Sequence, residues 1–415
     1  MSPHLVRDGS IWIKPLKNKQ MKLNQKIFKA VAVIIITATL MASCNKSLPE
    51  AEPITTTPPS GSSIAELLDD PDFSILKAAV NRAGKGITGL LGDKTGVFTF
   101  FAPNNAAFQF SGIPSEAAIG FLRSGLLDTI LKYHIIGGQK IAAADISTGF
   151  SNMYLQSSFV LAPPSASLPP GLRMPIFPSK RGSFAWANNI PVIQADIQAA
   201  NGVIHKVAAI VAPPSKVLFQ RVAADPDLTY LFAAVIRADS GDAAKTLQSA
   251  LSNPAANLTV FAPTNLAFQQ ILTGQITLAL IAQGLPPATA AATATALASS
   301  PTVFQNPALY SALSAQTVKG LVVYHILGTR AFSVNIPVAA TNVPTLLNGA
   351  IAAHPGVSLK ATFGATGVTA ATVKGLANPT ASNIQINPTP EPNGTSDQHY
   401  INGTLHKIDQ VLRPQ

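Results

Sequence analysis

The sequence predicts an α+β protein built from two tandem copies of one domain, and three recurring motifs carry this prediction. The segment Phe98-Thr-Phe-Phe-Ala-Pro-Asn-Asn-Ala-Ala-Phe108 returns as Leu258-Thr-Val-Phe-Ala-Pro-Thr-Asn-Leu-Ala-Phe268. A Tyr-His pair and then an Asn-Gly-x-x-His-Lys segment follow each copy, at Tyr133-His134, Asn201–Lys206, Tyr324-His325 and Asn402–Lys407. Three blocks that recur in the same order indicate a duplication, and the two domains are expected at residues 62–213 and 214–415.

Composition and charge exclude several classes of protein. Hydrophobic residues make up 47% of the 415 residues and charged residues 12%, so the chain can bury cores and is not a disordered protein. After the N-terminal region no stretch approaches the roughly 20 apolar residues that span a membrane. The net charge is +10, but residues 1–43 contribute +6 of it. The thinly spread remainder contains no basic stripe with aromatic residues, which argues against a nucleic-acid partner.

The N-terminal region has the pattern of a secretory signal peptide. Lysines from Lys14 to Lys29 precede an apolar segment that ends in small residues at Ser43. We therefore expect residues 1–43 to be a signal peptide, with either Met1 or Met21 as the true start. Cys44 is the only cysteine, so no intramolecular disulfide can stabilise either domain.

The position of Cys44 resembles the lipobox of bacterial lipoproteins, with Met41 where that family usually has leucine. The resemblance implies lipidation of Cys44 and export, with the protein anchored to the bacterial membrane on its periplasmic side or at the cell surface. Several acyl chains would make that attachment stable. Residues 44–61 are rich in Pro, Thr and Ser and are expected to be a flexible tether. A free buried thiol or an uncleaved anchor helix is the alternative.

Each domain is expected to open with a helix that follows an acidic turn. Asp70-Pro-Asp72 and Asp225-Pro-Asp227 precede apolar residues at helical spacing, and an aspartate can cap the amides of the first turn. Ile75, Leu76, Ala79 and Val80 then share one helical face.

The Phe-Ala-Pro motif predicts a corner between a strand and a helix. Residues 98–101 and 258–261 have strand composition, and a proline ends each run because it has no amide hydrogen. Asn104 or Asn105, and Thr264 or Asn265, can cap the helix that follows. The phenylalanine that closes each motif is expected in the core.

Around the two later motifs the chain predicts a helix, a short strand and a hairpin. Apolar helices are expected over 121–131 and 318–323, followed by strands over 134–136 and 325–327. Each Asn-Gly pair is expected to form a two-residue hairpin loop, since both residue types tolerate positive φ.

The two copies differ mainly between their first and second motifs. The spacing from Phe101 to Tyr133 is 32 residues, whereas Phe261 and Tyr324 are 63 apart. The additional material includes an Ala-rich segment at 284–297 that favours a surface helix. The first copy has its own Pro-rich addition at 162–170, and the Pro-containing join at 211–215 is expected to restrict the relative orientation of the domains.

Together the three motifs resemble those of the fasciclin domain family. The resemblance implies a β-sandwich-like wedge with helices packed on one side, and a role in adhesion through a protein or polysaccharide ligand at the cell surface. In animal members the Tyr-His region is connected with integrin binding. Carried over to this sequence, that nominates four residues for interaction: Tyr133, His134, Tyr324 and His325.

No arrangement of residues predicts catalysis, a cofactor or a metal. The sequence contains no Gly-x-Ser-x-Gly elbow and no His-x-x-x-His pair. His134 with His205, and His325 with His406, could approach across a sheet, but no further ligands accompany them. Hydrogen-bonded structural histidines are therefore expected.

These observations favour a membrane-anchored, non-enzymatic adhesion or binding protein of the bacterial cell envelope. The alternative is a structural or accessory subunit of an envelope complex, such as one for polysaccharide uptake. A hydrolase in the divergent loops is a third hypothesis. The sequence leaves the identity of the ligand and the oligomeric state open.

Overall fold

The computed structural model describes residues 60–150, 152–161, 171–364 and 367–415. The described residues from 60 onward belong to one compact unit. The expected signal peptide, Cys44, most of the tether and the Pro-rich addition at 162–170 lie outside the described residues. The predictions made for them stay predictions.

The first copy consists of short helices, a six-stranded sheet and a two-stranded sheet. Its helical elements are α2 (Ile64–Leu67), η1 (Pro71–Phe73), α3 (Ser74–Ala83), α4 (Lys85–Gly92), α5 (Asn105–Phe110), α6 (Glu116–Ile119) and α7 (Ser124–His134). Its strands are β1 (Phe98–Pro103), β2 (Ile135–Gly137), β3 (Leu155–Val160), β4 (Arg173–Ile176), β5 (Pro178–Arg181), β6 (Phe184–Ala187), β7 (Ile190–Ala199) and β8 (Gly202–Val207).

The second copy repeats this order with additional helices. Its helical elements are α8 (Leu218–Ala224), α9 (Thr229–Ala238), α10 (Thr246–Ser252), α11 (Asn265–Ala282), α12 (Pro287–Ala298), η2 (Pro301–Gln305), η3 (Pro307–Leu309), α13 (Ala315–Tyr324), η4 (Ser333–Asn335) and η5 (Leu346–Gly349). Its strands are β9 (Leu258–Pro263), β10 (Ile326–Leu327), β11 (Thr341–Val343), β12 (Val357–Gly364), β13 (Gly367–Lys374), β14 (Ser382–Ile384), β15 (Gln398–Tyr400) and β16 (Gly403–Ile408).

The main sheets have the same central arrangement in both copies. The strand order is β2-β1-β8-β7-β6-β5 in the first and β10-β9-β16-β14-β13-β12-β11 in the second, where β15 also pairs with β16. β1 pairs with β8 in parallel, as β9 does with β16, while the other pairs are antiparallel. The first and the last repeated motifs therefore lie side by side as the second and third strands of each sheet.

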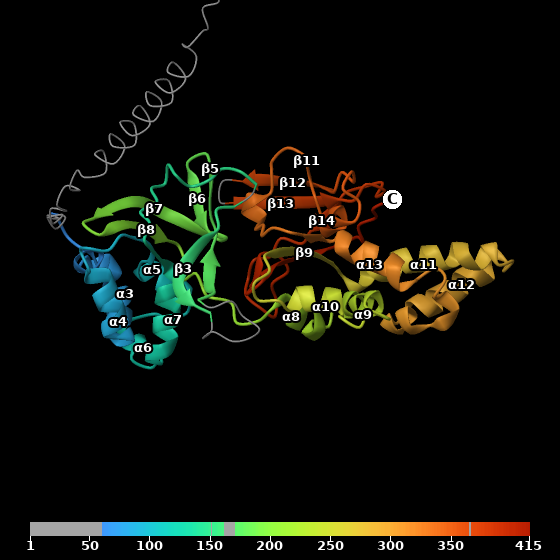
Figure 1. Cartoon of the computed structure of the whole chain (residues 1–415), viewed down its shortest axis with the longest axis horizontal. Coiled ribbons are helices and arrows are strands. Elements are labelled where there is room, and N and C mark those ends of the chain that lie inside the picture. The colour runs from blue at the N-terminus through green and yellow to red at the C-terminus, as the bar shows by residue number, and fades with distance from the viewer. Residues whose placement is uncertain (1–59, 151, 162–170, 365–366) are drawn as a thin grey trace, which may run out of the picture. The chain divides into compact units, whose positions relative to one another are not determined.

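Each sheet separates two layers of core, which explains why the strand of the first motif is buried on both faces. Phe98 and Phe100 pack toward the helices, with Ile75 and Leu131, whereas Phe101 packs on the other face. All six residues of β1 are buried, as are all six of β9. Figure 1 shows α3, α4, α6 and α7 gathered on one side of the first sheet. The predicted α+β class with helices packed on one side is confirmed.

The predicted helix caps after the first motif are confirmed in both copies. Asn104 Oδ1 accepts from the amide of Ala107, and Thr264 Oγ1 accepts from that of Ala267. Asn105 has a different role, since its Oδ1 accepts from the Ile75 amide. It therefore joins the corner after the strand to the start of α3.

The aspartate caps expected for the opening helices are not confirmed. Helices α3 and α9 begin without a side-chain cap, and Asp70 and Asp225 accept from the amides two residues later in the preceding turn.

Two predictions of element boundaries need correction. Helix α7 begins at Ser124, and Phe121, which was expected within the helix, is 91% exposed before it. His134 is the last residue of α7 and not the first of a strand. The apolar content of the 121–131 segment suggested a longer helix, but its first residues form the turn after α6.

The two hairpins are present, but each loop lies one residue earlier than expected. Ala199 pairs with Gly202, so Ala200 and Asn201 form the loop. Asn201 does not have positive φ; its Oδ1 accepts from the amide of Ile64 and its Nδ2 donates to the Leu91 carbonyl. Asn402 makes the corresponding contacts in the second copy. The asparagine thus attaches the first helix of each copy to the sheet.

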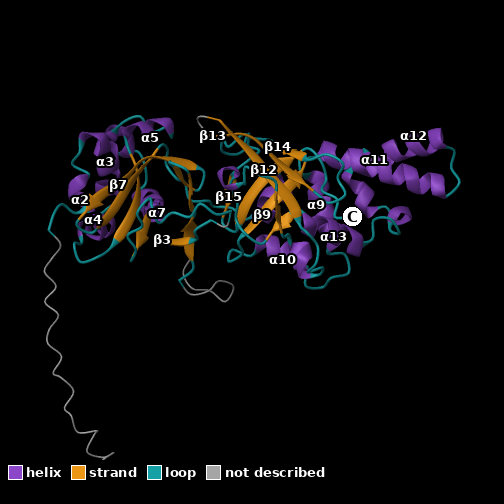
Figure 2. Cartoon of the chain, turned by 90° about the horizontal axis from the view of Figure 1, so that it is seen from above, coloured by secondary structure: helices purple, strands orange, loops and turns teal. Residues whose placement is uncertain are grey.

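The addition in the second copy forms helices, as its alanine content predicts. Helix α5 has 6 residues, whereas the corresponding α11 has 18. Figures 1 and 2 show α12 alongside α11, and Ala290, Ala294 and Ala298 provide a buried small-residue face on α12.

Gly202 is the position where the central parallel pair should tolerate substitution least. Its φ is +152°, and a Cβ would overlap the carbonyl of Phe98 on the neighbouring strand. We expect Gly202→Ala to lower the free energy of unfolding by about 3 kcal/mol or more. Gly89→Ala, in α4 with open space around its Cβ, should be neutral or slightly stabilising. Urea unfolding measures both; an equal effect at the two positions would contradict the prediction.

Candidate functional site

The histidine of the Tyr-His motif connects a helix to the end of its domain. His134 Nδ1 lies 2.8 Å from the Ile130 carbonyl, and its Nε2 accepts from the amide of Val211 at 2.9 Å. Because an amide can only donate, Nε2 carries no proton, and Nδ1 must be the donor to the carbonyl. The neutral imidazole therefore joins α7 to the segment that leaves the domain.

The second copy repeats this connection. His325 Nδ1 lies 2.8 Å from the Leu321 carbonyl, and Nε2 accepts from the Leu412 amide at 2.8 Å. Burial lowers the pKa of both His134 and His325 to about 4, against the weaker raising effect of the carbonyl contact. Both rings are therefore neutral near neutral pH.

The tyrosine of the same motif is also committed to internal contacts. Tyr133 Oη donates to the Pro175 carbonyl at 3.0 Å and accepts from Asn188 Nδ2 at 3.1 Å. Tyr324 Oη donates to the Gly356 carbonyl at 2.7 Å. Burial raises the pKa of both phenols. Each tyrosine connects its helix to the far layer of the core.

The four residues nominated for interaction are thus buried. Tyr133, His134 and Tyr324 are 0% exposed and His325 is 1% exposed. A partner cannot touch these side chains while the domains keep this structure. Their direct role in the fold is structural, and a role in an interaction stays a prediction.

The histidine of the last motif is held in the same manner. His205 Nε2 lies 2.9 Å from the Ile141 carbonyl, and Nδ1 accepts from the Asp196 amide at 3.3 Å. His406 makes the corresponding two contacts in the second copy, at 3.0 and 3.2 Å. Across the described ranges no three His, Cys, Asp or Glu side chains are grouped so that they could hold a metal ion.

The lysine that ends the last motif pairs with the acidic turn that opens the domain. Lys206 Nζ lies 2.8 Å from Asp72, and its hydrogen bond holds the pKa of that carboxyl below its usual range. Lys407 Nζ lies 2.9 Å from Asp225 and 3.2 Å from Asp227. The hydrogen-bonding side chains of the repeated motifs are thus committed to contacts within their own copy.

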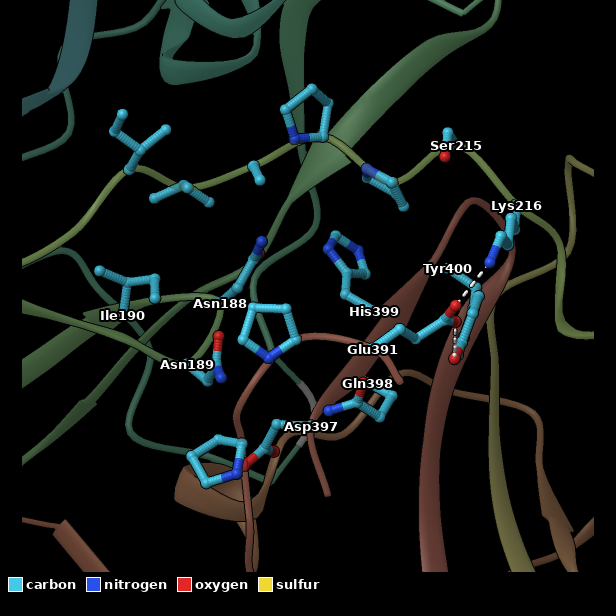
Figure 3. A pocket seen from close by; sticks show the side chains of 17 residues that line it. Asn188, Asn189, Ile190, Ser215, Lys216, Glu391, Asp397, Gln398, His399 and Tyr400 are labelled. Carbon is cyan, nitrogen blue, oxygen red and sulfur yellow. Dashed lines mark hydrogen bonds and ion pairs between the residues drawn. The ribbon is translucent and has the colours of Figure 1, made fainter. Parts of the chain in front are cut away.

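A pocket of about 360 Å³ lies where the join between the copies passes the second sheet. Figure 3 shows its lining, which comes from residues 188–190, from the join at 210–216 and from 388–400. Four prolines contribute to it. It lies outside the repeated motifs, although Asn188 and the Val211 amide in its lining contact Tyr133 and His134 of the Tyr-His motif.

Side chains from both copies pack beside this pocket. Asn152 Nδ2 donates to the Arg330 carbonyl at 3.1 Å, and Arg181 Nη2 donates to the Ile336 carbonyl at 2.9 Å. Phe177 and Phe332 have ring centroids 6.2 Å apart. These contacts supplement the short join, and the expected restriction of domain orientation stays a prediction.

The charged groups at one end of the pocket are paired with one another. Glu391 accepts from Lys216 Nζ at 2.5 Å and from Tyr400 Oη at 2.6 Å, as Figure 3 shows, and Arg221 lies 3.8 Å away. Burial alone would raise the pKa of Glu391. The hydrogen bonds from Lys216 and Tyr400, with the nearby positive charges, lower this pKa by more, so its net value lies below the usual one and the carboxyl is ionised. This end presents no net negative charge to a ligand.

His399 lies in the pocket with a defined tautomer. Arg330 Nη1 is 2.7 Å from His399 Nε2, and because a guanidinium can only donate, His399 carries its proton on Nδ1. Burial and the neighbouring Arg330 charge lower the pKa of His399. Arg330 is itself 1% exposed, and its guanidinium lies 4.6 Å from the centre of the Phe177 ring.

Three neutral polar groups of the lining have no partner among the described residues. They are the Asn189 amide, the Ser215 hydroxyl and Nδ1 of His399. In contrast, Asn188 is fully used, since its Oδ1 accepts from the Phe177 amide and its Nδ2 donates to Tyr133. The pocket therefore offers uncharged donors and acceptors beside proline rings.

Sequence reasoning did not find this pocket. Arg330, His399 and Asn189 lie outside the repeated motifs, and nothing in their local sequence distinguishes them. The one signal available in the sequence was Arg330 itself, because the chain has few charged residues. Its pairing with a histidine 69 residues later depends on the fold.

These findings agree with the comparisons with known proteins. The family model of the fasciclin domain matches residues 71–213 and 232–414, and the chain belongs to the fasciclin domain family. Domains of this family are typically adhesion and binding modules. In the described part of the chain no helix has both the length and the apolar character to cross a membrane.

Several relatives share part of the chain. Transforming growth factor-beta-induced protein ig-h3 from Sus scrofa is 34% identical over 160 residues, which are 38% of this chain and 20% of that protein. Protein sll1483 from Synechocystis sp. is 34% identical over 145 residues, 34% of this chain and 68% of the relative. The chain thus spans about a fifth of the length of the ig-h3 proteins it matches. A solved fasciclin domain pair from the insect cell adhesion molecule Fasciclin I is similar over 84% of this chain and 95% of its own, with 14% identity and a TM-score of 0.32.

The neutral histidines predict a loss of stability in acid. The unfolded histidine titrates near 6.5, whereas folded His134 and His325 titrate at about 4, so the unfolded chain binds more protons between these values. Their contribution is complete above pH 6.5 and decreases as the pH falls to 4, by about 3 kcal/mol for each histidine. Urea unfolding across this range measures the loss.

The His134→Gln variant provides the control for this prediction. It should be less stable near pH 7 and show a smaller decrease in acid, because one of the two titrating rings is absent. An NMR titration that gave ordinary pKa values for both rings in the folded protein would contradict the assignment.

Proposed function

We propose that this protein is a non-enzymatic adhesion or binding protein, anchored to the bacterial membrane through Cys44, and that it binds a polysaccharide in the pocket at the join. Membership of the fasciclin family supports the adhesion class. The observation that carries the ligand proposal is the set of unpartnered neutral groups in this pocket. Saccharide hydroxyls can both donate to and accept from such groups.

The absence of catalysis is part of this proposal. Among the described residues no hydroxyl or thiol side chain donates to a histidine ring, as an activated nucleophile would. The histidines of the repeated motifs use both ring nitrogens for contacts with the backbone. Both carboxylates of the pocket are occupied by internal partners, Glu391 by Lys216 and Tyr400, and Asp397 by the amide and hydroxyl of Ser333.

Binding to neutral oligosaccharides tests the proposed ligand class. We expect a glycan array to identify a neutral oligosaccharide ligand, and calorimetry to give a dissociation constant about tenfold weaker or more for the Asn189→Ala/Ser215→Ala variant. Stability should not change, because neither side chain makes a hydrogen bond within the described structure.

Asn81→Ala is the matched control, since Asn81 is exposed on α3 and does not line the pocket. It should bind as the unmodified protein does. An array without any hit, or affinity that the double variant leaves unchanged, would reject the pocket as a saccharide site. Specific capture of a protein partner in place of a glycan would assign the other class of ligand.

Membrane attachment through Cys44 is tested separately. We expect Cys44→Ala to move the protein from the membrane fraction to the soluble fraction, because the acyl chains that hold it would be absent. Ser47→Ala, three residues away, should stay in the membrane fraction. Equal distribution of the two variants would exclude lipidation of Cys44.

A further inference from the structure

A second pocket, of about 580 Å³, lies within the second copy and is distinct from the pocket at the join. Its volume is in the range typical of small-molecule sites. Phe268 and Phe304 provide the aromatic part of the lining, and the centroids of their rings lie 6.0 Å apart in an edge-to-face arrangement. Leu272, Leu313 and Val318 add aliphatic side chains that are also buried.

The segment that distinguishes the second copy builds this pocket. Ile271, Leu272 and Gln275 come from the part of α11 that extends beyond the length of α5, and Phe304 and Leu313 come from the elements that follow α12. The common fasciclin scaffold therefore does not account for this wall. An addition that produces an apolar concave surface is a reasonable place for a function specific to this chain.

The walls are held together before any ligand binds. Tyr230 Oη donates to the Ala298 carbonyl at 2.7 Å and accepts from Gln269 Nε2 at 3.1 Å, which connects α9, α11 and α12. The Tyr230 ring also stacks on Phe268, with centroids 6.2 Å apart. A preformed pocket reduces the ordering cost of binding.

One cationic side chain lies at the rim. Arg413 lines the pocket, no Asp or Glu side chain does, and Arg413 forms no ion pair with any described residue. Its backbone is fixed, since its amide donates to Asn378 Oδ1 at 2.7 Å and the Leu412 amide donates to His325. His354, also in the lining, is occupied by the Gly356 amide and the Pro414 carbonyl. Among its side chains the lining thus combines apolar groups with one positive charge.

From this combination we propose that the pocket binds a free fatty acid, with its alkyl chain against Phe268 and Phe304 and its carboxylate at Arg413. Burial of the methylene groups of the alkyl chain supplies most of the affinity. The guanidinium selects the anionic head, because it presents paired donors that match a carboxylate. The proposal is independent of saccharide binding at the join.

Gly320 provides a way to close the pocket without damaging the fold. It lies in α13 and lines the pocket, and a Cβ there would meet no atom within 4 Å. We expect Gly320→Leu to fill the space and weaken dodecanoate binding about a hundredfold or more. Stability should be kept or increased, because leucine favours a helix more than glycine does.

Gly274→Leu is the matched control. Gly274 lies in α11, also has open space around its Cβ, and does not line the pocket. Calorimetry with dodecanoate should give unchanged affinity for this variant. Failure of dodecanoate to bind the unmodified protein, or equal affinity of the two leucine variants, would overturn the proposal.

The head group is tested with Arg413→Gln and three ligands of equal chain length. Dodecanoate should bind more tightly than dodecanol or dodecylphosphocholine, and Arg413→Gln should weaken dodecanoate about tenfold while leaving dodecanol unchanged. Equal binding of dodecanoate and dodecanol would overturn the assigned role of Arg413. Tighter binding of dodecylphosphocholine would assign a zwitterionic lipid head in place of the free acid.

Discussion

The parallel pairing of the first and last motif strands is the constraint on which the rest of each domain depends. It places Phe98 opposite Gly202, and Leu258 opposite Gly403, at a separation that leaves no room for a side chain. The same pairing brings Lys206 to Asp72 and Lys407 to Asp227, so the end of each domain is joined to its beginning. Strand pairing between distant segments has a high loop-closure cost, and a buried ion pair alone is weak evidence of stability. Burial of the paired strands on both faces is therefore the main source of the stability of each domain. The glycine opposite the first strand and the lysine that ends the last motif define how the two strands meet.

The neutral histidines add a second connection that does not depend on strand pairing. A ring that accepts from one backbone amide and donates to one carbonyl satisfies two polar groups that would otherwise be buried without partners. The helix that carries the Tyr-His motif, α7 or α13, is thereby joined to the last segment of its domain in both copies. In the second copy the same connection fixes the backbone next to Arg413, at the rim of the apolar pocket. A feature that serves the common fold thus also positions a side chain that differs between the copies.

The sequence was sufficient for the fold class and for local structure, because repeated motifs, caps and apolar periodicity act over short distances. Asn104 and Thr264 cap helices as expected, and the apolar faces of α3 and α9 are buried. It could not show that the first and last motifs are parallel neighbours, since pairing partners 104 residues apart leave no local pattern. The contact between Arg330 and His399 could not be predicted for the same reason, since the two residues are 69 positions apart. Asn201 and Asn402 illustrate a different limit: positive φ and a side-chain tether are both compatible with Asn-Gly, and only the neighbouring helix decides between them.

Because the motif side chains of this chain are used inside the fold, we propose that the segments between the motifs determine what each copy binds. The two pockets of this chain are lined mainly by such segments, and their linings differ in polarity. The pocket at the join is lined by amide, hydroxyl and imidazole groups beside prolines; its Glu391 is paired with Lys216, and its Asp397 accepts hydrogen bonds from Ser333. The pocket behind α11 is lined by aromatic and aliphatic side chains with a single arginine at the rim. Ligands suited to one would pay a desolvation penalty in the other. The two proposed ligands would therefore bind without competition, provided that each pocket keeps the backbone connections made by its neighbouring motif residues.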